Sequence, residues 1–382
     1  MASLFDPITI RGITIRNRTM LSPMCMYSAT NGFPNDWHFV HLGSRAVGGA
    51  GLILTEDTAV LEEGRISAGD LGLWSDEHIK PLARIADFVH AQGAAFGFQL
   101  GYSGRKGSTT IPWRGGQPLG EGRALGPNER PWQTFGPSPI AYGGTRGQVR
   151  TEMSIGDIRR VQQGFVDAAL RADKLGADVV EFHAAWGYVF QQFYSPLSNQ
   201  RDDEYGGSFD NRIRFLLETA EAVREVWPPH KPLFARIALS DWVEGGWTFE
   251  EAVALSSKLQ QAGVDLVDGS SGGIGHFKLN RQLSPLMHVL LIKRVREEAG
   301  IATGANFGIE TPEEANEIVK SNVADMVTIG RAMLRDPYWA CHAAEALKDD
   351  RLFYPNPYEH WLTGRSVVNK SEGQNGIVNG LT

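Results

Sequence analysis

The segment Val179-Val180-Glu181-Phe182-His183-Ala184-Ala185-Trp186-Gly187-Tyr188 begins as an apolar run and ends in polar and aromatic side chains. A short run of this kind is typical of a buried strand. Ionisable groups that follow directly on a buried strand often belong to a functional site. The same pattern recurs along the chain and therefore bears on the whole fold.

Eight short apolar runs, each followed by a segment long enough for a helix, predict a closed parallel (β/α)8 TIM barrel in the α/β class. The predicted strands are residues 19–21, 52–54, 95–100, 179–182, 233–237, 266–267, 301–303 and 326–329. Helical patterns between them cover residues 155–175, 212–226, 249–262, 312–319 and 338–347. The alternative, an open doubly wound sheet, would need a glycine fingerprint after its first strand, whereas Gly48-Gly49-Ala50-Gly51 precedes a strand.

Residues 101–150 are rich in Gly, Pro and Trp and are too many for a simple loop, so we expect a capping insertion between strands three and four. We expect residues 1–365 to form a single barrel domain. Residues 366–382 are polar and glycine-bearing and are predicted to form a flexible tail.

The composition favours small-molecule chemistry. The chain has 382 residues, 42% of them hydrophobic, and contains no apolar run near the length of a membrane span. Its first residues lack the basic and apolar regions of a secretion signal, so we expect a cytoplasmic protein. Two cysteines, Cys25 and Cys341, cannot form a disulfide framework. A net charge of −7 without a basic cluster argues against nucleic-acid binding.

In a barrel the active site lies at the carboxyl ends of the strands, so the polar residues that follow each run are the candidates. An amide such as Gln99 can pair with the edge of a flat ring, and the cation of Arg236 can stabilise negative charge on that ring. The loops after strands seven and eight, which contain Gly308, Gly330 and Arg331, often hold a phosphate in such barrels. Flavin mononucleotide (FMN) meets both requirements and is the predicted cofactor.

Several motifs resemble the Old Yellow Enzyme family. They are Pro23-Met24-Cys25-Met26-Tyr27, Gln99-Leu100, Ser103-Gly104-Arg105-Lys106, the stretch from His183 to Tyr188, and a block comprising residues 195–199, 203–208 and 211–212. The Cys25 and Tyr27 start, Phe307 and Trp361 are most similar to the xenobiotic-reductase branch. The resemblance covers residues 4–365. It implies an FMN barrel that takes hydride from NADPH or NADH and passes it through flavin N5 to an activated C=C bond. It also implies a homodimer or larger homo-oligomer and no metal.

The resemblance also implies roles for individual residues. Tyr188 would be the proton donor, and His183 and Trp186 would donate hydrogen bonds to the electron-withdrawing oxygen of the substrate. Such donors stabilise the charge that hydride addition pushes onto that oxygen. Residues in contact with substrate would be Tyr27, Trp186, Phe307 and Trp361. Residues that hold FMN would be Pro23, Met24, Cys25, Asp57, Gln99, Arg236, Gly308, Gly330 and Arg331.

Three positions depart from the family pattern and are predicted to face the flavin or its ligand. Trp186 replaces a second His or Asn donor, Asp57 replaces a small or neutral residue, and Tyr102 replaces a frequent histidine. An indole offers one N–H and accepts no hydrogen bond, and a carboxylate near a reduced flavin must be protonated or paired. These departures indicate a specialised substrate or a modified reaction.

Other interpretations stay open. The chain could be an FMN barrel enzyme run oxidatively, such as a desaturase or an amine demethylase, or a flavin-binding protein that has lost turnover. Trp186 could only pack, and Asp57 could only pair with a cation or cap a loop. His38 and His41 have a spacing seen in metal sites but no third ligand in the sequence, so structural hydrogen bonding is the favoured interpretation.

Overall fold

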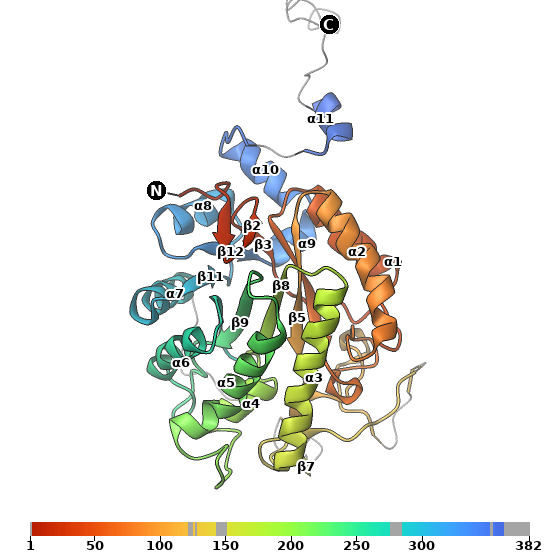
Figure 1. The fold of residues 1–382 in the computed structure, drawn as a ribbon, viewed down its shortest axis with the longest axis vertical. Coiled ribbons are helices and arrows are strands. Elements are labelled where there is room, and N and C mark those ends of the chain that lie inside the picture. The colour runs from red at the N-terminus through yellow and green to blue at the C-terminus, as the bar shows by residue number, and fades with distance from the viewer. Residues whose placement is uncertain are drawn as a thin grey trace, which may run out of the picture.

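Eight parallel strands close into a barrel, which confirms the predicted fold (Figure 1). The structure, a computed structural model, describes residues 2–120, 125–126, 128–142, 151–275, 285–351 and 354–362. In spatial order the strands are β3 (Thr19–Leu21), β4 (Leu52–Ala59), β5 (Ala95–Gly101), β8 (Val179–Ala184), β9 (Leu233–Ala238), β10 (Leu266–Ser270), β11 (Ala302–Ala305) and β12 (Met326–Ile329), and β12 pairs with β3.

Several strands run further than the apolar runs that predict them. β4 continues through Glu56 and Asp57 to Ala59, and the whole strand is buried. The sequence pattern ends early there because polar side chains on the inner face of a barrel interrupt an apolar run without ending the strand.

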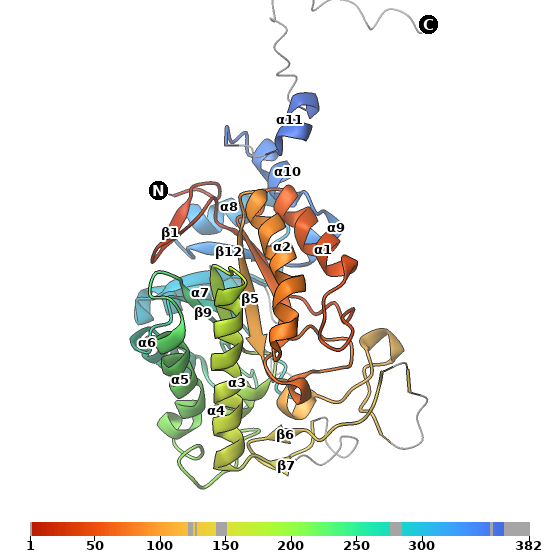
Figure 2. The ribbon, with the colours of Figure 1, turned by 45° about the vertical axis from the view of Figure 1, so that its right-hand side comes forward.

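Helices pack around the strands and cover the outside of the barrel (Figures 1 and 2). Helices α1, α3, α6 and α8 begin at capping boxes in which Asn35, Ser154, Thr248 or Thr311 binds the first turn. The helices are α1 (Asp36–Val47), α2 (Ile79–Ala91), α3 (Ile155–Lys174), α4 (Val189–Tyr194), α5 (Phe209–Val226), α6 (Phe249–Gln261), α7 (Pro285–Ala299), α8 (Pro312–Lys320), α9 (Arg331–Arg335), α10 (Trp339–Ala346) and α11 (Asn356–Leu362).

The inside of the barrel has two levels. The lower level is an apolar cluster with side chains from β3, β4, β5, β8, β9, β10 and β12. Ile10 and Ile15 belong to it and come from an antiparallel hairpin, β1 (Ile8–Ile10) and β2 (Ile13–Ile15), at the amino terminus of the chain. Side chains alternate along a strand, so residues two or four positions further on lie above this cluster on the same face. These residues are Gln99, Glu181, Arg236, Asp268 and Thr328, and they form a polar upper level.

The predicted cap lies over the carboxyl ends of the strands. Its described part contains two short 3-10 turns, Gly104–Lys106 and Pro112–Arg114, and the paired segments β6 (Phe135–Gly136) and β7 (Thr151–Glu152). Lys106 Nζ donates to the carbonyl of Trp186 at 2.6 Å, Arg105 donates to the carbonyl of Ile274, and Trp132 Nε1 donates to that of Glu63 at 3.0 Å. The cap therefore contacts the loops that follow β8, β10 and β4.

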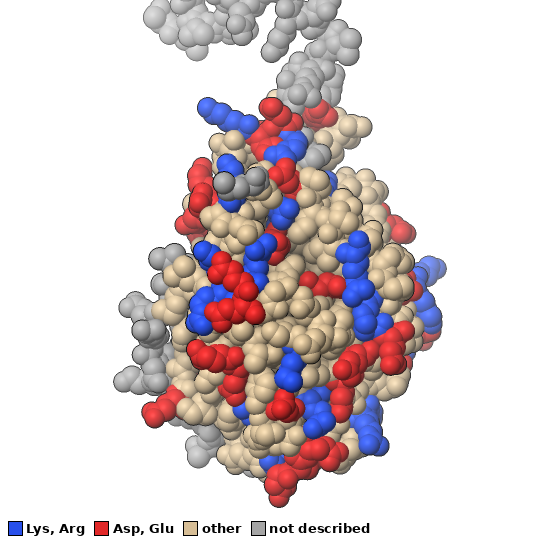
Figure 3. Space-filling view, turned by 60° about the vertical axis from the view of Figure 1, so that its left-hand side comes forward, with Lys and Arg blue, Asp and Glu red and all other residues tan. Residues whose placement is uncertain are grey.

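Acidic and basic side chains are interspersed over the face of the molecule shown in Figure 3. No helix in the described ranges is long and apolar enough to cross a bilayer. The predicted tail, residues 366–382, lies outside the residues that the structure describes.

Candidate active site

A cavity of about 430 Å³ opens at the carboxyl ends of β3, β8, β9, β11 and β12. It brings together nine of the predicted site residues. They are Pro23, Met24, His183, Trp186, Arg236, Phe307, Gly308, Gly330 and Arg331. The strands thus supply the side chains of one site from distant parts of the sequence, as expected for this fold.

Arg236 forms a buried part of the cavity wall. Its residue is 7% exposed, its Nη1 donates to Ser22 Oγ at 3.2 Å, and its Nε lies 3.5 Å from Asp268 Oδ2. Nε itself makes no hydrogen bond. The guanidinium therefore has donor capacity left for a negatively charged group in the cavity.

Gln99 is held from one side by Glu181. The Gln99 amide Nε2 donates to Glu181 Oε1 at 2.8 Å, and Glu181 is fully buried. Burial raises the pKa of Glu181 to about 8, and the carboxylate of Asp268 acts in the same direction, whereas Arg236 opposes it. Burial also raises the pKa of Asp268. Sequence reasoning missed both acids as site residues; the signal was a charged residue within or directly after an apolar run.

His183 and Tyr188 form an edge-to-face pair at the end of β8. Their ring centroids are 4.6 Å apart at an interplanar angle of 71°, and both residues are buried. Burial, followed by the charges of Arg236 and Lys106, holds the pKa of His183 well below its ordinary value, so the imidazole is neutral. Burial raises the pKa of Tyr188 well above its ordinary value, so the phenol keeps its proton at neutral pH.

The turn that presents Tyr188 is fixed by α4. The Gly187 N–H donates to Gln191 Oε1 at 2.7 Å, and Gln192 Nε2 donates to the Gly187 carbonyl at 2.7 Å. Gly187 has a φ of 72°, and a Cβ at this position would lie 2.0 Å from the carbonyl oxygen of Gly273. Only glycine fits this crossing of two loops.

Trp186 precedes this glycine and has a φ of 56°, in the left-handed region that ordinary residues seldom adopt. Its residue is 43% exposed, and it lines the cavity. The turn thus places an indole at the mouth of the site.

Cys25 and Tyr27 follow β3 and are half-buried. Burial, with Asp57 as the largest charge contribution, raises the pKa of Cys25 well above its ordinary value, so this cysteine is a neutral thiol. The ring of Tyr27 meets the ring of Trp113 in the cap edge-on, with centroids 6.3 Å apart. The cap and the loop after β3 therefore touch through these two aromatic residues.

The prediction that Tyr102 faces the flavin or its ligand is wrong. Tyr102 follows the last residue of β5, is 1% exposed, and belongs to the apolar core and not to the lining of the cavity. Its ring packs against Gly64, where an added Cβ would lie 2.8 Å from Tyr102 Cδ2. Glu63 and Arg160 are the charged groups that influence its hydroxyl.

Trp361 does not lie at the cavity of its own chain. It belongs to α11, which lies at the end of the molecule opposite β6, β7 and the cap (Figure 2). The residue is 81% exposed. A role for Trp361 in substrate binding would require a second copy of the chain, and such an assembly stays a prediction.

His38 has a structural role, as the sequence indicated. Its Nδ1 accepts from the Asn35 N–H at 3.1 Å, and its Nε2 lies 3.2 Å from Glu56 Oε1. Glu56 Oε2 accepts from the Met26 N–H at 2.8 Å. This chain of contacts ties the loop after β3 to α1. The described residues contain no cluster of three His, Cys, Asp or Glu side chains placed to bind a metal.

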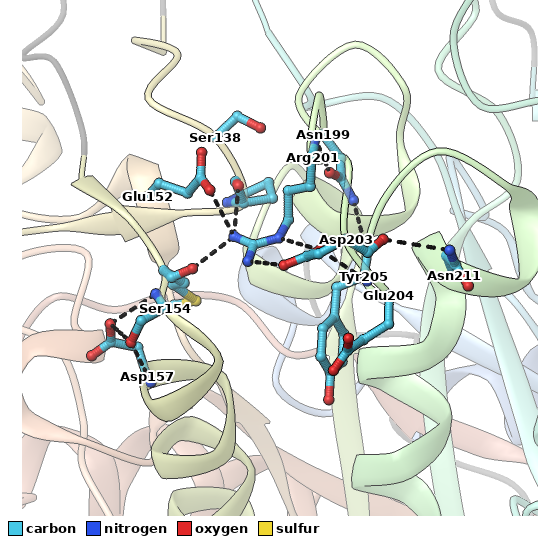
Figure 4. Close-up of polar contacts among 12 residues, drawn as sticks. Ser138, Glu152, Ser154, Asp157, Asn199, Arg201, Asp203, Glu204, Tyr205 and Asn211 are labelled. Carbon is cyan, nitrogen blue, oxygen red and sulfur yellow. Dashed lines mark hydrogen bonds and ion pairs between the residues drawn. The ribbon is translucent and has the colours of Figure 1, made fainter.

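The block from Ser195 to Arg212 ties the barrel to the cap (Figure 4). Arg201 donates to the carbonyls of Pro137 and Met153 at 3.0 and 2.7 Å and pairs with Asp203 at 2.5 Å. Glu152 of β7 lies 3.5 Å from the same guanidinium. The motif that carried much of the family resemblance is thus a structural device at the side of the site.

The donor set of the cavity fits FMN. Arg236 can face a ring that gains negative charge, and Gln99, on the same upper level but two strands away, supplies an amide for a ring edge. At the other end the cavity is lined by two glycines, Gly308, with a φ of 75°, and Gly330, which leave the backbone without side chains. The exposed Arg331 supplies a cation there. A Cβ on Gly330 would lie 3.6 Å from Met24 Sδ, which is an ordinary contact. The surrounding protein therefore leaves room for a small side chain at this position.

Comparison with known proteins agrees with this geometry. Residues 3–350 match the family model described as "NADH:flavin oxidoreductase / NADH oxidase family". The chain is 42% identical over 346 residues to an "NADPH dehydrogenase" of Geobacillus sp. (strain WCH70), covering 90% of this chain and 94% of that protein.

Two solved structures show the same fold. One is a complex of 2-naphthoyl-CoA reductase, at a TM-score of 0.79 and 25% identity, covering 90% of this chain and 52% of that one, so the chain spans about half of that protein. The other is the old yellow enzyme homologue from Zymomonas mobilis, at a TM-score of 0.73 and 24% identity, covering 91% and 93% of the two chains.

The barrel, the donor set of its cavity and a family match over nearly the whole chain lead to one conclusion. The chain belongs to the NADH:flavin oxidoreductase / NADH oxidase family, that is, the Old Yellow Enzyme family, and is an FMN-dependent oxidoreductase that uses NAD(P)H.

Proposed function

We propose that this protein is an ene-reductase, which adds a hydride and a proton across an activated C=C bond of a small molecule. The observation that carries the proposal is the ring pair of Tyr188, a protonated phenol, and His183, a neutral imidazole that lines the cavity. FMN, when bound, supplies the hydride that it has received from NADPH or NADH.

Tyr188 supplies the proton in this proposal. Its hydroxyl is buried, and its pKa lies well above the ordinary value, so it keeps its proton until negative charge develops on the substrate. Lys106 Nζ lies 4.6 Å from the centroid of the Tyr188 ring. This ammonium favours the phenolate that forms when the proton leaves.

His183 binds the activating oxygen of the substrate. A neutral imidazole has one N–H to donate, and His183 Nδ1 is buried without a hydrogen-bond partner in the structure. The Trp186 indole N–H is the second donor. Because the indole is bulkier than a histidine ring and cannot ionise, we propose that it narrows the set of substrates rather than abolishing turnover.

Rapid-mixing kinetics of the wild type, Tyr188→Phe and Trp186→His variants with cyclic enones would test the proposal. We expect NADPH to reduce FMN in all three, and Tyr188→Phe to slow the enone step by roughly 10²- to 10⁴-fold, the usual range for a positioned general acid. Trp186→His should gain activity on simple enones. Tyr338→Phe, at the N-cap position of α10, is the matched control and should behave as wild type.

Four results would contradict parts of this proposal. Undiminished enone turnover by Tyr188→Phe would remove Tyr188 as the proton donor. Ordinary activity of the wild type on simple enones, with no gain in Trp186→His, would remove the specialisation. Sluggish reduction of FMN by NADPH would favour an oxidative enzyme, such as a desaturase or an amine demethylase, and full FMN occupancy without any turnover would favour a binding protein.

A further inference from the structure

Gln99 lies between two buried acids on neighbouring strands. Asp57 of β4 is its ladder partner on one side, and Glu181 of β8 is its partner on the other. Residues opposite one another in a ladder project to the same face, so both carboxyl groups point toward the inside of the barrel. Gln99 donates to Glu181, whereas Asp57 Oδ1 makes no hydrogen bond. Asp57 is only 3% exposed, so solvent does not satisfy it.

The backbone is shaped to admit this carboxyl group. The β4–β5 register shifts between Leu54 and Asp57, an irregularity that re-aims the side chains after it. Gly101 of β5 leaves the space that the carboxyl occupies, because a Cβ on Gly101 would lie 1.6 Å from Asp57 Oδ1. Asp57 is thus packed against a neighbouring strand by the fold itself.

The surroundings of Asp57 disfavour a negative charge. The titratable groups that face it are Cys25 and Tyr27 after β3, Glu56 on β4, Asp70 after β4, Lys106 after β5 and Tyr188 after β8. Burial, followed by the carboxylates of Asp70 and Glu56, raises the pKa of Asp57 well above its ordinary value, and Lys106 opposes this only in part.

The charged groups that face Asp57 have partners of their own. Glu56 binds His38 and Met26, and Asp70 binds the amides of Ile66 and Ser67. Lys106 Nζ donates to the Trp186 carbonyl, and Asp57 Oδ1 has no hydrogen-bond partner among the described residues. A buried carboxylate without a donor is costly, whereas a neutral carboxylic acid has an O–H of its own to donate.

We propose that Asp57 is a neutral hydrogen-bonding acid of the flavin site, which holds its proton in the resting protein and, once ionised, disfavours the reduction of bound FMN. The proton leaves to solvent, and the charge remains beside Gln99. The proposal rests on FMN binding by the family fold and deepens the proposed function by adding a residue that sets the reduction potential. It does not depend on which substrate is reduced.

The test compares the holoenzyme with Asp57→Asn, Asp57→Ala and Asp70→Asn. Asparagine has the shape of the neutral acid and cannot ionise, and alanine removes the group altogether. The reduction potential of bound FMN would be measured from mildly acidic to alkaline pH. Asp70→Asn is the matched control, because burial raises the pKa of Asp70 to about 7 and Asp70 therefore titrates in the same series.

We expect wild type and Asp57→Asn to have the same potential at mildly acidic pH. As the pH rises, the wild-type potential should fall more steeply than that of either Asp57 variant, and the steeper fall should persist in Asp70→Asn. A higher potential of Asp57→Asn already at mildly acidic pH would show an ionised Asp57 and overturn the proposal. Parallel curves for wild type and both Asp57 variants would also overturn it.

FMN occupancy, read from the visible absorbance, separates this test from that of the proposed function. A wild type that binds no FMN would contradict the assignment of the cofactor. If Asp57→Asn fails to bind FMN, Asp57→Ala supplies the same comparison of slopes. Loss of enone turnover in Tyr188→Phe has no bearing on these potentials, so the two proposals can fail separately.

Discussion

Acids on the inner face of the barrel differ from surface acids because burial favours their protonated form. Glu181 is fully buried beside Asp268 and shares with it the cation of Arg236. Its sequence context, an apolar run with one glutamate, predicts a strand but not the protonation state. That state depends on partners from β9 and β10, which only the closed barrel brings near.

The stability of the protein should depend on pH through Glu181. Its pKa rises from an ordinary value of 4.5 to about 8 in the folded protein, so between these values the folded protein holds a proton that the unfolded chain has released. Stability therefore falls as the pH rises through this window. We expect Glu181→Gln, which cannot ionise, to show a shallower fall in urea unfolding measured with excess FMN.

Glu221→Gln is the control for this measurement, because Glu221 is exposed on α5. It should follow the wild-type curve. An unchanged slope in Glu181→Gln would contradict the titration of Glu181 in this window.

At the scale of elements, the buried cation of Arg201 helps to join the cap to the barrel. Arg201 has a side chain 4% exposed and connects Pro137, Met153 and Asp203 (Figure 4). These partners lie on both sides of the cap and in the loop after α4. The resemblance to a family identified this block, but its structural use was not readable from the sequence because the carbonyl acceptors carry no side-chain signal.

Arg201→Ala should destabilise the protein by roughly 2 to 3 kcal/mol, because two carbonyls and a carboxylate lose their donor. Chemical denaturation would measure this loss. The matched control is Arg160→Ala, which removes an exposed ion pair with Glu63 and should cost less than about 1 kcal/mol. Equal effects of the two substitutions would contradict a special role for Arg201.

The sequence patterns predicted strands and helices well where polar and apolar residues alternated with the period of the element. All eight strands and the five helices named from the sequence are present, and α5 begins at Phe209 instead of residue 212 because Ser208 caps it. The second half of β4 was missed because Glu56 and Asp57 interrupt the apolar run. Tyr102 was wrongly placed because the side of the barrel on which it lies depends on the residue at which β5 ends.

At the scale of the whole molecule, the closed barrel and its cap account for the family match, which ends at residue 350. The polar residues that follow the apolar runs could be named as candidates from the sequence, and nine predicted residues meet at one cavity. The sequence alone could not show at which end of the barrel a residue outside the strands lies. Trp361, assigned to the site by resemblance, lies on α11, at the end of the molecule opposite the cap.

Truncation after residue 365 should leave the molecule intact. This change removes the predicted tail and keeps the barrel strands, the cap and α11. We expect unchanged FMN content, thermal unfolding temperature and sedimentation coefficient relative to the full chain. Loss of FMN or a lower unfolding temperature would show that residues beyond 365 belong to the domain.

The interior of the barrel has an apolar lower level, the floor, and a polar upper level. Substitutions at the two levels therefore have different consequences for the protein. Substitutions in the floor, around Phe234 and Met326, alter how well the molecule survives heat and leave the reacting groups in place. Substitutions above it act on the polar groups of the site and, at Glu181, on the pH dependence of stability. Heat resistance can therefore be altered at the apolar positions with little direct effect on the polar groups of the site.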